Sequence, residues 1–114
     1  MRKLRPKRTT ATGPAGFFRV FTYRVTPAQR PLFRKTYGPA GPWACLFAQA
    51  DGYLGTNLLQ RSGSVNEFMT IDTWKSESAW SAFVAAHGQR YAQMSRDCQR
   101  LYRVESEIGS FGSL

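Results

Sequence analysis

The chain has 114 residues, enough for one domain with its own hydrophobic core and too few for two. Hydrophobic residues make up 42% and aromatic residues 14%, yet no apolar run approaches the roughly 18 residues that would cross a bilayer. The net charge is +9, with ten bases and no acid in residues 1–50, and six bases against seven acids in residues 51–114.

The N-terminus is basic. Half of the early bases lie in the first eight residues, MRKLRPKR, and the TTATGPAG that follows is polar and small. This pattern lacks the apolar core of a secretory signal, so a cytoplasmic protein is expected. We expect residues 1–16 to form a flexible tail before one domain over residues 17–114. Weak, nonspecific nucleic-acid contact through residues 2–8 is one role for such a tail, and a simple solubilising end is the other.

The residues that most often bind metals are few. The chain has two cysteines, Cys45 and Cys98, and one histidine, His87. A structural zinc site needs about four such ligands, so no metal is expected. Both cysteines are interpreted as buried thiols in a reducing compartment, with a single disulfide as the alternative.

The first half of the domain is predicted to hold one strand and two helices. Aromatic and β-branched residues fill FFRVFTYRV. Thr26 and Gln29 then have the spacing of a capping box, with Pro27 at the first helical position. GPAGP breaks this helix before the apolar WACLFAQA. The expected elements are a strand over residues 17–25, a helix over 27–37 and a short helix over 43–50.

The second half is predicted to hold a hairpin, a long helix and a last strand. YLGTNLLQR and EFMTIDTW flank the loop SGSVN. Ser76 is the expected N-cap of the helix, with Glu77 at its positive end and an irregularity near Gly88. In YRVESEIGSF, apolar and charged residues alternate. The expected elements are strands over residues 53–61 and 67–74, a helix over 77–101 and a strand over 102–111.

This order of elements predicts an α+β fold of the ferredoxin-like βαββαβ type, a four-stranded antiparallel sheet with helices on one face. The first and third strands are apolar on both sides, with Phe21 and Phe68 on one side and Val20 and Ile71 on the other. An antiparallel sheet face exposed to water would be polar. The uncovered face is therefore expected to pack against a second copy of the chain, giving a homodimer.

Three segments, GPWACLFAQADGYLGTNLL, FMTIDTWKSESAWSAFVAAH and ESEIGSF, resemble the antibiotic biosynthesis monooxygenase family of the dimeric α/β barrel superfamily. The resemblance implies two ferredoxin-like protomers joined through their sheets, each with a pocket between sheet and helices. Some members oxidise phenolic polyketide intermediates with dioxygen and no cofactor, others degrade haem, and many have no known substrate. The chemistry must therefore be judged from the residues of this chain.

Within the predicted pocket, Trp74, His87 and Asp72 are the candidate catalytic residues. Trp74 matches a tryptophan that the family places at the end of the third strand. Helical spacing puts His87 on one inward stripe with Trp80, Val84, Tyr91, Met94, Cys98 and Leu101. The candidate substrate-binding residues are Tyr23, Asn57, Trp80, Phe83, Tyr91 and Trp43.

Each catalytic candidate has a structural alternative. His87 is either a proton acceptor or a core histidine bonded to the Tyr91 hydroxyl. Asp72 has either a raised pKa or an ion pair with Arg19 or Arg24, and the ion pair is the favoured interpretation. An aromatic stripe at helical spacing is also most often simply core.

The leading hypothesis is a cofactor-independent monooxygenase that oxidises a small phenolic or quinone-like compound with dioxygen. A non-catalytic dimer that binds a small hydrophobic ligand is the alternative. Haem degradation is less favoured, because Tyr23 and Val84 stand where the resemblance implies an asparagine and an iron-binding histidine.

Overall fold

The structure is a computed structural model that describes residues 16–114. The predicted basic tail therefore lies outside the described residues, apart from Gly16. The elements in chain order are β1 (Phe17–Arg24), α1 (Arg30–Tyr37), α2 (Pro42–Phe47), β2 (Tyr53–Gln60), β3 (Glu67–Trp74), α3 (Glu77–Asp97), the short 3-10 helix η1 (Cys98–Leu101) and β4 (Val104–Gly112).

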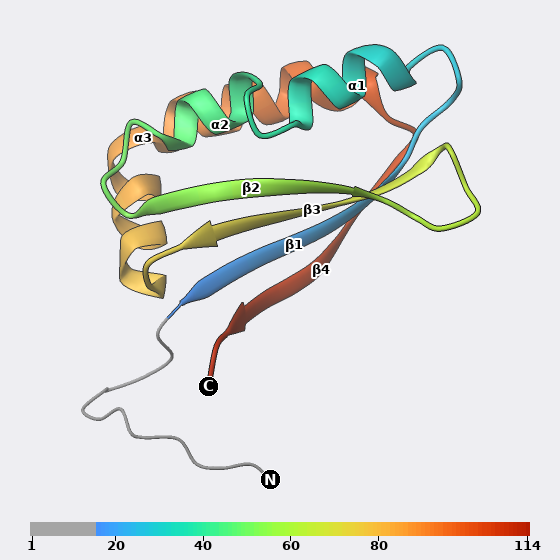
Figure 1. Ribbon diagram of the computed structural model, residues 1–114. Helices are drawn as coiled ribbons and strands as arrows, with labels where there is room; N and C mark the ends of the chain where they lie inside the picture. Colours follow the sequence, from blue (N-terminus) through green and yellow to red (C-terminus); the bar gives the residue numbers. More distant parts are fainter. Residues whose placement is uncertain (1–15) are drawn as a thin grey trace, which may run out of the picture.

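The four strands form one antiparallel sheet in the order β2-β3-β1-β4. All the helices lie over one face of this sheet, and the other face is left open (Figure 1). The predicted ferredoxin-like α+β fold is therefore confirmed. No helix within residues 16–114 combines the length and the apolar character needed to cross a membrane.

The capping box before α1 forms as predicted, but the helix begins later. The Thr26 backbone N–H donates to Gln29 Oε1 (2.9 Å), and the Gln29 N–H donates to Thr26 Oγ1 (3.2 Å). Regular helix starts only at Arg30. The Arg30 N–H donates to the Thr26 carbonyl at 3.1 Å, but Pro31 has no N–H to donate to the carbonyl of Pro27, so the run of α-helical bonds is interrupted at this point.

The long helix α3 is capped as predicted, since Ser76 Oγ accepts from the Ala79 N–H at 3.1 Å. Its irregularity falls at His87, whose backbone is non-helical (φ −126°, ψ 17°), one residue before Gly88. Because glycine stabilises a helix poorly, the bend occurs beside it. The α-helix ends at Asp97 and tightens into η1 instead of continuing unchanged to residue 101.

The buried stripe of α3 differs from the predicted one at a single position. Phe83 is 1% exposed, whereas Val84 is 38% exposed. A residue three positions after Trp80 faces the sheet here, so the stripe passes through Phe83 rather than Val84. Cys98 is buried in this stripe as expected. Cys45 is exposed, so the prediction of a buried thiol was wrong for this residue.

Strand β4 presents its charged side, not its apolar side, to the helices. Glu105 pairs with Tyr23 and Glu107 with Phe21, and both partners lie on the helix-covered side of β1. The pairing then shifts register between Val20 and Phe21. On the opposite side Ile108 is 50% exposed. The register with β1, and not the hydrophobicity of β4, thus decides which side of this edge strand faces inward.

Candidate functional site

A cavity of about 90 Å³ lies between the sheet and the helices, where the resemblance predicted a pocket. Side chains from all four strands form its floor, because the inward-facing positions of neighbouring strands lie side by side. The floor residues are Thr56 on β2, Thr70 and Asp72 on β3, Phe21 and Tyr23 on β1, and Glu105 on β4.

The roof of the cavity is largely aromatic. Trp43 and Phe47 come from α2, and their rings lie 5.4 and 6.3 Å from the ring of Tyr91 on α3. Tyr37 on α1 packs against Tyr23 of the floor at 4.9 Å. Rings in these tilted and edge-to-face arrangements are held firmly in place. The roof residues are Tyr37, Trp43, Phe47, Tyr91 and Ser95.

Asp72 is the end of a short chain of hydrogen bonds. Thr56 Oγ1 donates to Asp72 Oδ1 at 2.6 Å, so the hydroxyl of Tyr53 must be the donor in its 2.5 Å contact with Thr56 Oγ1. Burial raises the pKa of Asp72 from its ordinary 3.8 to about 6, although the hydrogen bond from Thr56 and the charge of Arg19 both oppose this rise. Asp72 is therefore a carboxylate whose proton exchanges near neutral pH.

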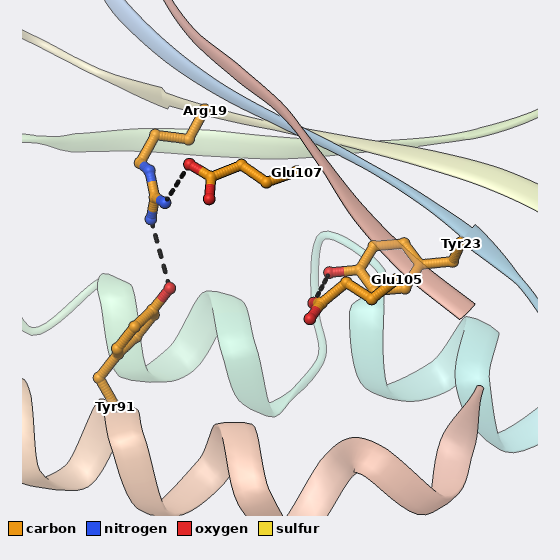
Figure 2. A network of polar contacts seen from close by, with 5 residues as sticks. All are labelled: Arg19, Tyr23, Tyr91, Glu105 and Glu107. Carbon is orange, nitrogen blue, oxygen red and sulfur yellow. Dashed lines mark hydrogen bonds and ion pairs between the residues drawn. The ribbon is translucent and has the colours of Figure 1, made fainter. Parts of the chain in front are cut away.

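Arg19 contacts other residues and does not form the predicted ion pair with Asp72. Its Nη2 lies 3.4 Å from Glu107 Oε2, and its Nη1 donates to the Tyr91 hydroxyl at 3.3 Å (Figure 2). Its Cζ also lies 4.1 Å from the ring centroid of Trp80. No ion pair of Asp72 occurs among residues 16–114. The favoured interpretation was thus wrong, and a raised pKa is what the structure shows.

A second carboxylate, Glu105, is held by two phenols. The Tyr23 hydroxyl donates to Glu105 Oε2 at 2.8 Å (Figure 2), and the Tyr102 hydroxyl donates to Oε1 at 3.3 Å. Burial raises the pKa of Tyr23, and the negative charge of Glu105 raises it further. The Tyr23 phenol therefore stays protonated and acts as a donor.

Four of the nine predicted site residues line the cavity. These are Asp72, Tyr23, Tyr91 and Trp43. Asn57 is exposed, and it pairs with Ile71 on the open side of the sheet. The structure does not bring it to the cavity, because its neighbour Thr56 takes the inward position on β2.

The other aromatic candidates pack behind the cavity wall. Trp74 is fully buried, and its ring centroid lies 5.3 Å from those of both Trp80 and Phe83. Phe47 separates this group from the cavity, since it packs against Trp74 at 5.5 Å and lines the cavity itself. The Trp74 indole N–H has no hydrogen-bond partner among residues 16–114. The structure thus places Trp74 in the core.

His87 lies away from the cavity. It stacks on Phe83, with ring centroids 5.3 Å apart, and it borders a surface groove near Lys75 and the start of α3. The hydroxyl of Tyr91, its proposed partner, accepts from Arg19 instead. His87 and Tyr91 lie four residues apart on α3, but Tyr91 lines the cavity and His87 borders the surface groove.

Several cavity residues had no signal in the sequence. Thr56 lies in a weak strand between two residues that disfavour strands, and Glu105 belongs to an alternation that is typical of a solvent-facing side. Only the register of the strands reveals that both face the helices. The aromatic Phe47 is indistinguishable in sequence from an ordinary core residue.

Solved structures with a similar fold include oxygenases. A cofactor-independent oxygenase from Streptomyces nogalater, SnoaB, is 21% identical over 90% of this chain and 95% of its own, with a TM-score of 0.58. A monooxygenase from the ActVA-Orf6 gene of Streptomyces coelicolor, solved with the ligand nanaomycin D, is 19% identical over 88% of each chain, with a TM-score of 0.64.

A third similar structure is a candidate antibiotic biosynthesis monooxygenase from Nitrosomonas europaea, 12% identical over 92% of this chain and 96% of its own, with a TM-score of 0.61. No family model matches the sequence, and no curated protein does. At such low identity the likeness establishes architecture rather than activity. The resemblance noted in the sequence therefore holds for the fold: the chain has the fold of the antibiotic biosynthesis monooxygenase-type proteins.

Proposed function

We propose that the cavity binds a small phenolic or quinone-like aromatic compound and that the protein oxidises it with dioxygen, without a cofactor. The observation that carries this proposal is Asp72, a carboxylate with a pKa of about 6 at the floor of an aromatic cavity. A general base is most effective when its pKa lies near the working pH.

In the proposed reaction the ionised Asp72 accepts the proton of a substrate hydroxyl. Thr56 donates to Oδ1 of Asp72, so Oδ2 is the oxygen with more capacity left to receive the proton. The resulting phenolate is electron-rich and gives electrons to dioxygen. The aromatic roof shields the Asp72 end of the cavity from bulk water, which would otherwise solvate the phenolate and make it less reactive.

The electrons balance without any further reductant. When a methylene group between two aromatic rings becomes a carbonyl, one oxygen atom of dioxygen enters the product and the other leaves as water. The carbon gives up four electrons and two protons, and these are what the reduction of dioxygen consumes. The protein therefore has to supply only a base, a dry cavity and a fixed orientation.

Oxygen uptake tests this function directly. Purified protein is incubated with a panel of anthrones and hydroquinones, and the uptake rate is compared with that of Asp72→Asn. We expect wild-type uptake to exceed that of the variant by about 100-fold or more. Asp97→Asn, which changes an exposed carboxylate of α3, is the matched control and should behave as wild type. Equal rates for wild type and Asp72→Asn would contradict the proposal.

Non-catalytic ligand binding is the second candidate function. The cavity has a volume of about 90 Å³, below the roughly 300–1,000 Å³ of pockets for drug-sized ligands, so a ligand held here has to be small. An aromatic-lined site of this size suits retention of a small ligand as well as turnover. A ligand that copurifies unchanged, together with a thermal shift but no oxygen uptake, would favour this function over oxidation.

Haem degradation receives no support from the placement of the relevant side chains. Val84, at the position where the resemblance implies an iron-binding histidine, is 38% exposed. His87 borders a surface groove rather than the cavity. Neither residue is therefore placed to hold an iron atom inside this cavity.

The proposed enzyme is a cytoplasmic homodimer. Apolar side chains on the open face of the sheet support the dimer, since such a face is costly to leave in water. The thiols of Cys45 and Cys98 are both free, which suits a reducing compartment. The half-exposed apolar residues of β2 and β4 include Leu59, Val104, Ile108 and Phe111.

A further inference from the structure

Glu105 lies at the opposite end of the cavity floor from Asp72. Asp72 pairs with Arg19, and Glu105 pairs with Tyr23, four residues further along β1 and on its other side. From strand geometry this separates their Cα atoms by roughly 17 Å, which combines about 14 Å along the strands and about 10 Å across them. The cavity therefore has a carboxylate at each end of a diagonal.

Two phenols hold the carboxylate of Glu105, a residue that is itself exposed to solvent. Tyr23 is only 6% exposed and packs against the rings of Phe33 and Tyr37, and this packing fixes the position of its hydroxyl group. Tyr102 packs against Tyr23 at 5.4 Å and holds the second oxygen. Each carboxylate oxygen can accept two hydrogen bonds, so each retains capacity for one more.

Among residues 16–114, those that line the cavity include two acids and no lysine or arginine. The guanidinium of Arg19 is engaged by Glu107 and Tyr91 and does not line the cavity. An anionic group on a ligand would therefore meet like charge at both ends of the floor, and the charge of Arg19, which acts on Asp72, would offset it only at that end. A hydrogen-bond donor at either end of a ligand would meet a negatively charged acceptor.

The geometry points to Glu105 as a specificity-determining residue: it accepts a hydrogen bond from a donor group at the end of the ligand remote from Asp72, and it repels a carboxylate there. The ligand class is a small, flat, uncharged aromatic compound with donors at opposite ends. This inference takes its binding site from the function proposed above, but it concerns selection of the ligand and not its oxidation.

Anaerobic binding of three matched probes tests the role of Glu105. The probes are 2,6-dihydroxynaphthalene, with a donor at each end, 2-naphthol, with one, and 6-hydroxy-2-naphthoate, with a carboxylate in place of the second donor. Isothermal titration calorimetry should show the diol binding about tenfold more tightly than 2-naphthol, because a hydrogen bond to a charged acceptor is worth about that factor. The naphthoate should bind most weakly.

The variant Glu105→Gln should change the order of the probes. We expect the diol to lose most of its advantage, 2-naphthol to stay within about twofold, and the naphthoate to bind more tightly, since the amide is neutral. Glu107→Gln is the control, because Glu107 lies on the same strand but contacts Arg19 outside the cavity. It should keep the wild-type order.

Equal weakening of all three probes in Glu105→Gln would assign Glu105 a structural role and overturn the inference. Equal affinity of the wild type for the diol and 2-naphthol, or binding of none of the probes, would overturn it as well. The wild-type comparison decides the matter even if Glu105→Gln does not fold. Because dioxygen is absent, failure of the proposed oxidation leaves this test unaffected, and the probes can discriminate whether or not the protein is an enzyme.

Discussion

At the scale of single residues, Asp72 is unusual because it has lost most of its solvent without gaining an ion pair. The hydrogen bond from Thr56 and the charge of Arg19 offset only part of that loss, so its pKa is raised to about 6. A carboxylate pKa shifted in this way is common at sites where a group must exchange protons. The raised pKa of Asp72 also makes the stability of the fold depend on pH.

The folded protein holds the Asp72 proton up to about pH 6, whereas the unfolded chain releases it near pH 3.8. The resulting stabilisation is complete below about pH 4 and is lost as the pH rises through 6. Asp72→Asn, which cannot ionise, should therefore gain about 2 kcal/mol relative to wild type between pH 4 and pH 8. Urea unfolding at both pH values measures this. An unchanged difference between the two proteins would mean that the carboxyl is not perturbed.

Thr56 should set the pH at which Asp72 works as a base. Its hydroxyl stabilises the ionised carboxylate at 2.6 Å, so Thr56→Val should raise the pKa of Asp72. We expect the midpoint of the pH–rate profile to move up from about pH 6 by about one unit, with little change in the plateau rate. A lower rate without any shift of the midpoint would show that Thr56 affects packing instead.

At the scale of elements, the local signals correctly predicted the capping interactions of two helices. The capping box at Thr26 and the N-cap at Ser76 both form. Where prediction and structure differ, a backbone effect explains the difference: Pro31 delays α1, and His87 beside Gly88 bends α3. The residues that cause these effects can be seen in the sequence, but the resulting change in backbone geometry cannot.

The N-cap of α3 gives a test at this scale. Ser76→Ala removes the acceptor of the Ala79 N–H and should lower the free energy of unfolding by about 1 kcal/mol. Ser81→Ala, an exposed position within the same helix, is the control and should change stability by less than about 0.5 kcal/mol. Chemical denaturation of both variants checks this. Equal effects would show that the cap contributes nothing specific.

At the scale of the whole molecule, the two faces of the sheet differ in what covers them. The helices cover one face and enclose the cavity, and the other is open (Figure 1). On the open side Ile108 and Phe111 are each 50% exposed. A second copy would bury both, and the chain would then leave no large apolar face in water.

The dimer is tested by charge on the open face. Phe111→Glu combined with Ile108→Glu should convert a dimer into a monomer in light scattering coupled to size exclusion, because the two added charges would be buried at the interface. Ser106→Glu on the same strand is a milder comparison. A wild-type monomer at micromolar concentration, or a double variant that stays dimeric, would argue against assembly through this face.

The sequence by itself determined the order of the elements and the ferredoxin-like sheet. These follow from periodicity, caps and turn residues, which act over a few neighbouring positions. The pocket between sheet and helices was expected from the family resemblance alone. It also identified Asp72, Tyr23, Tyr91 and Trp43, all of which line the cavity. The family resemblance held for the fold.

Only the tertiary structure decided which polar groups meet. The register of β4 on β1 brings Glu105 inward, and the register of β2 on β3 gives Asp72 a hydroxyl partner in Thr56. A shift of one residue would turn each of these side chains to the other face. The structure likewise places His87, a plausible base, at a surface groove and not in the cavity. Pairing between strands distant in sequence leaves little local trace, and so the site could be read only from the fold.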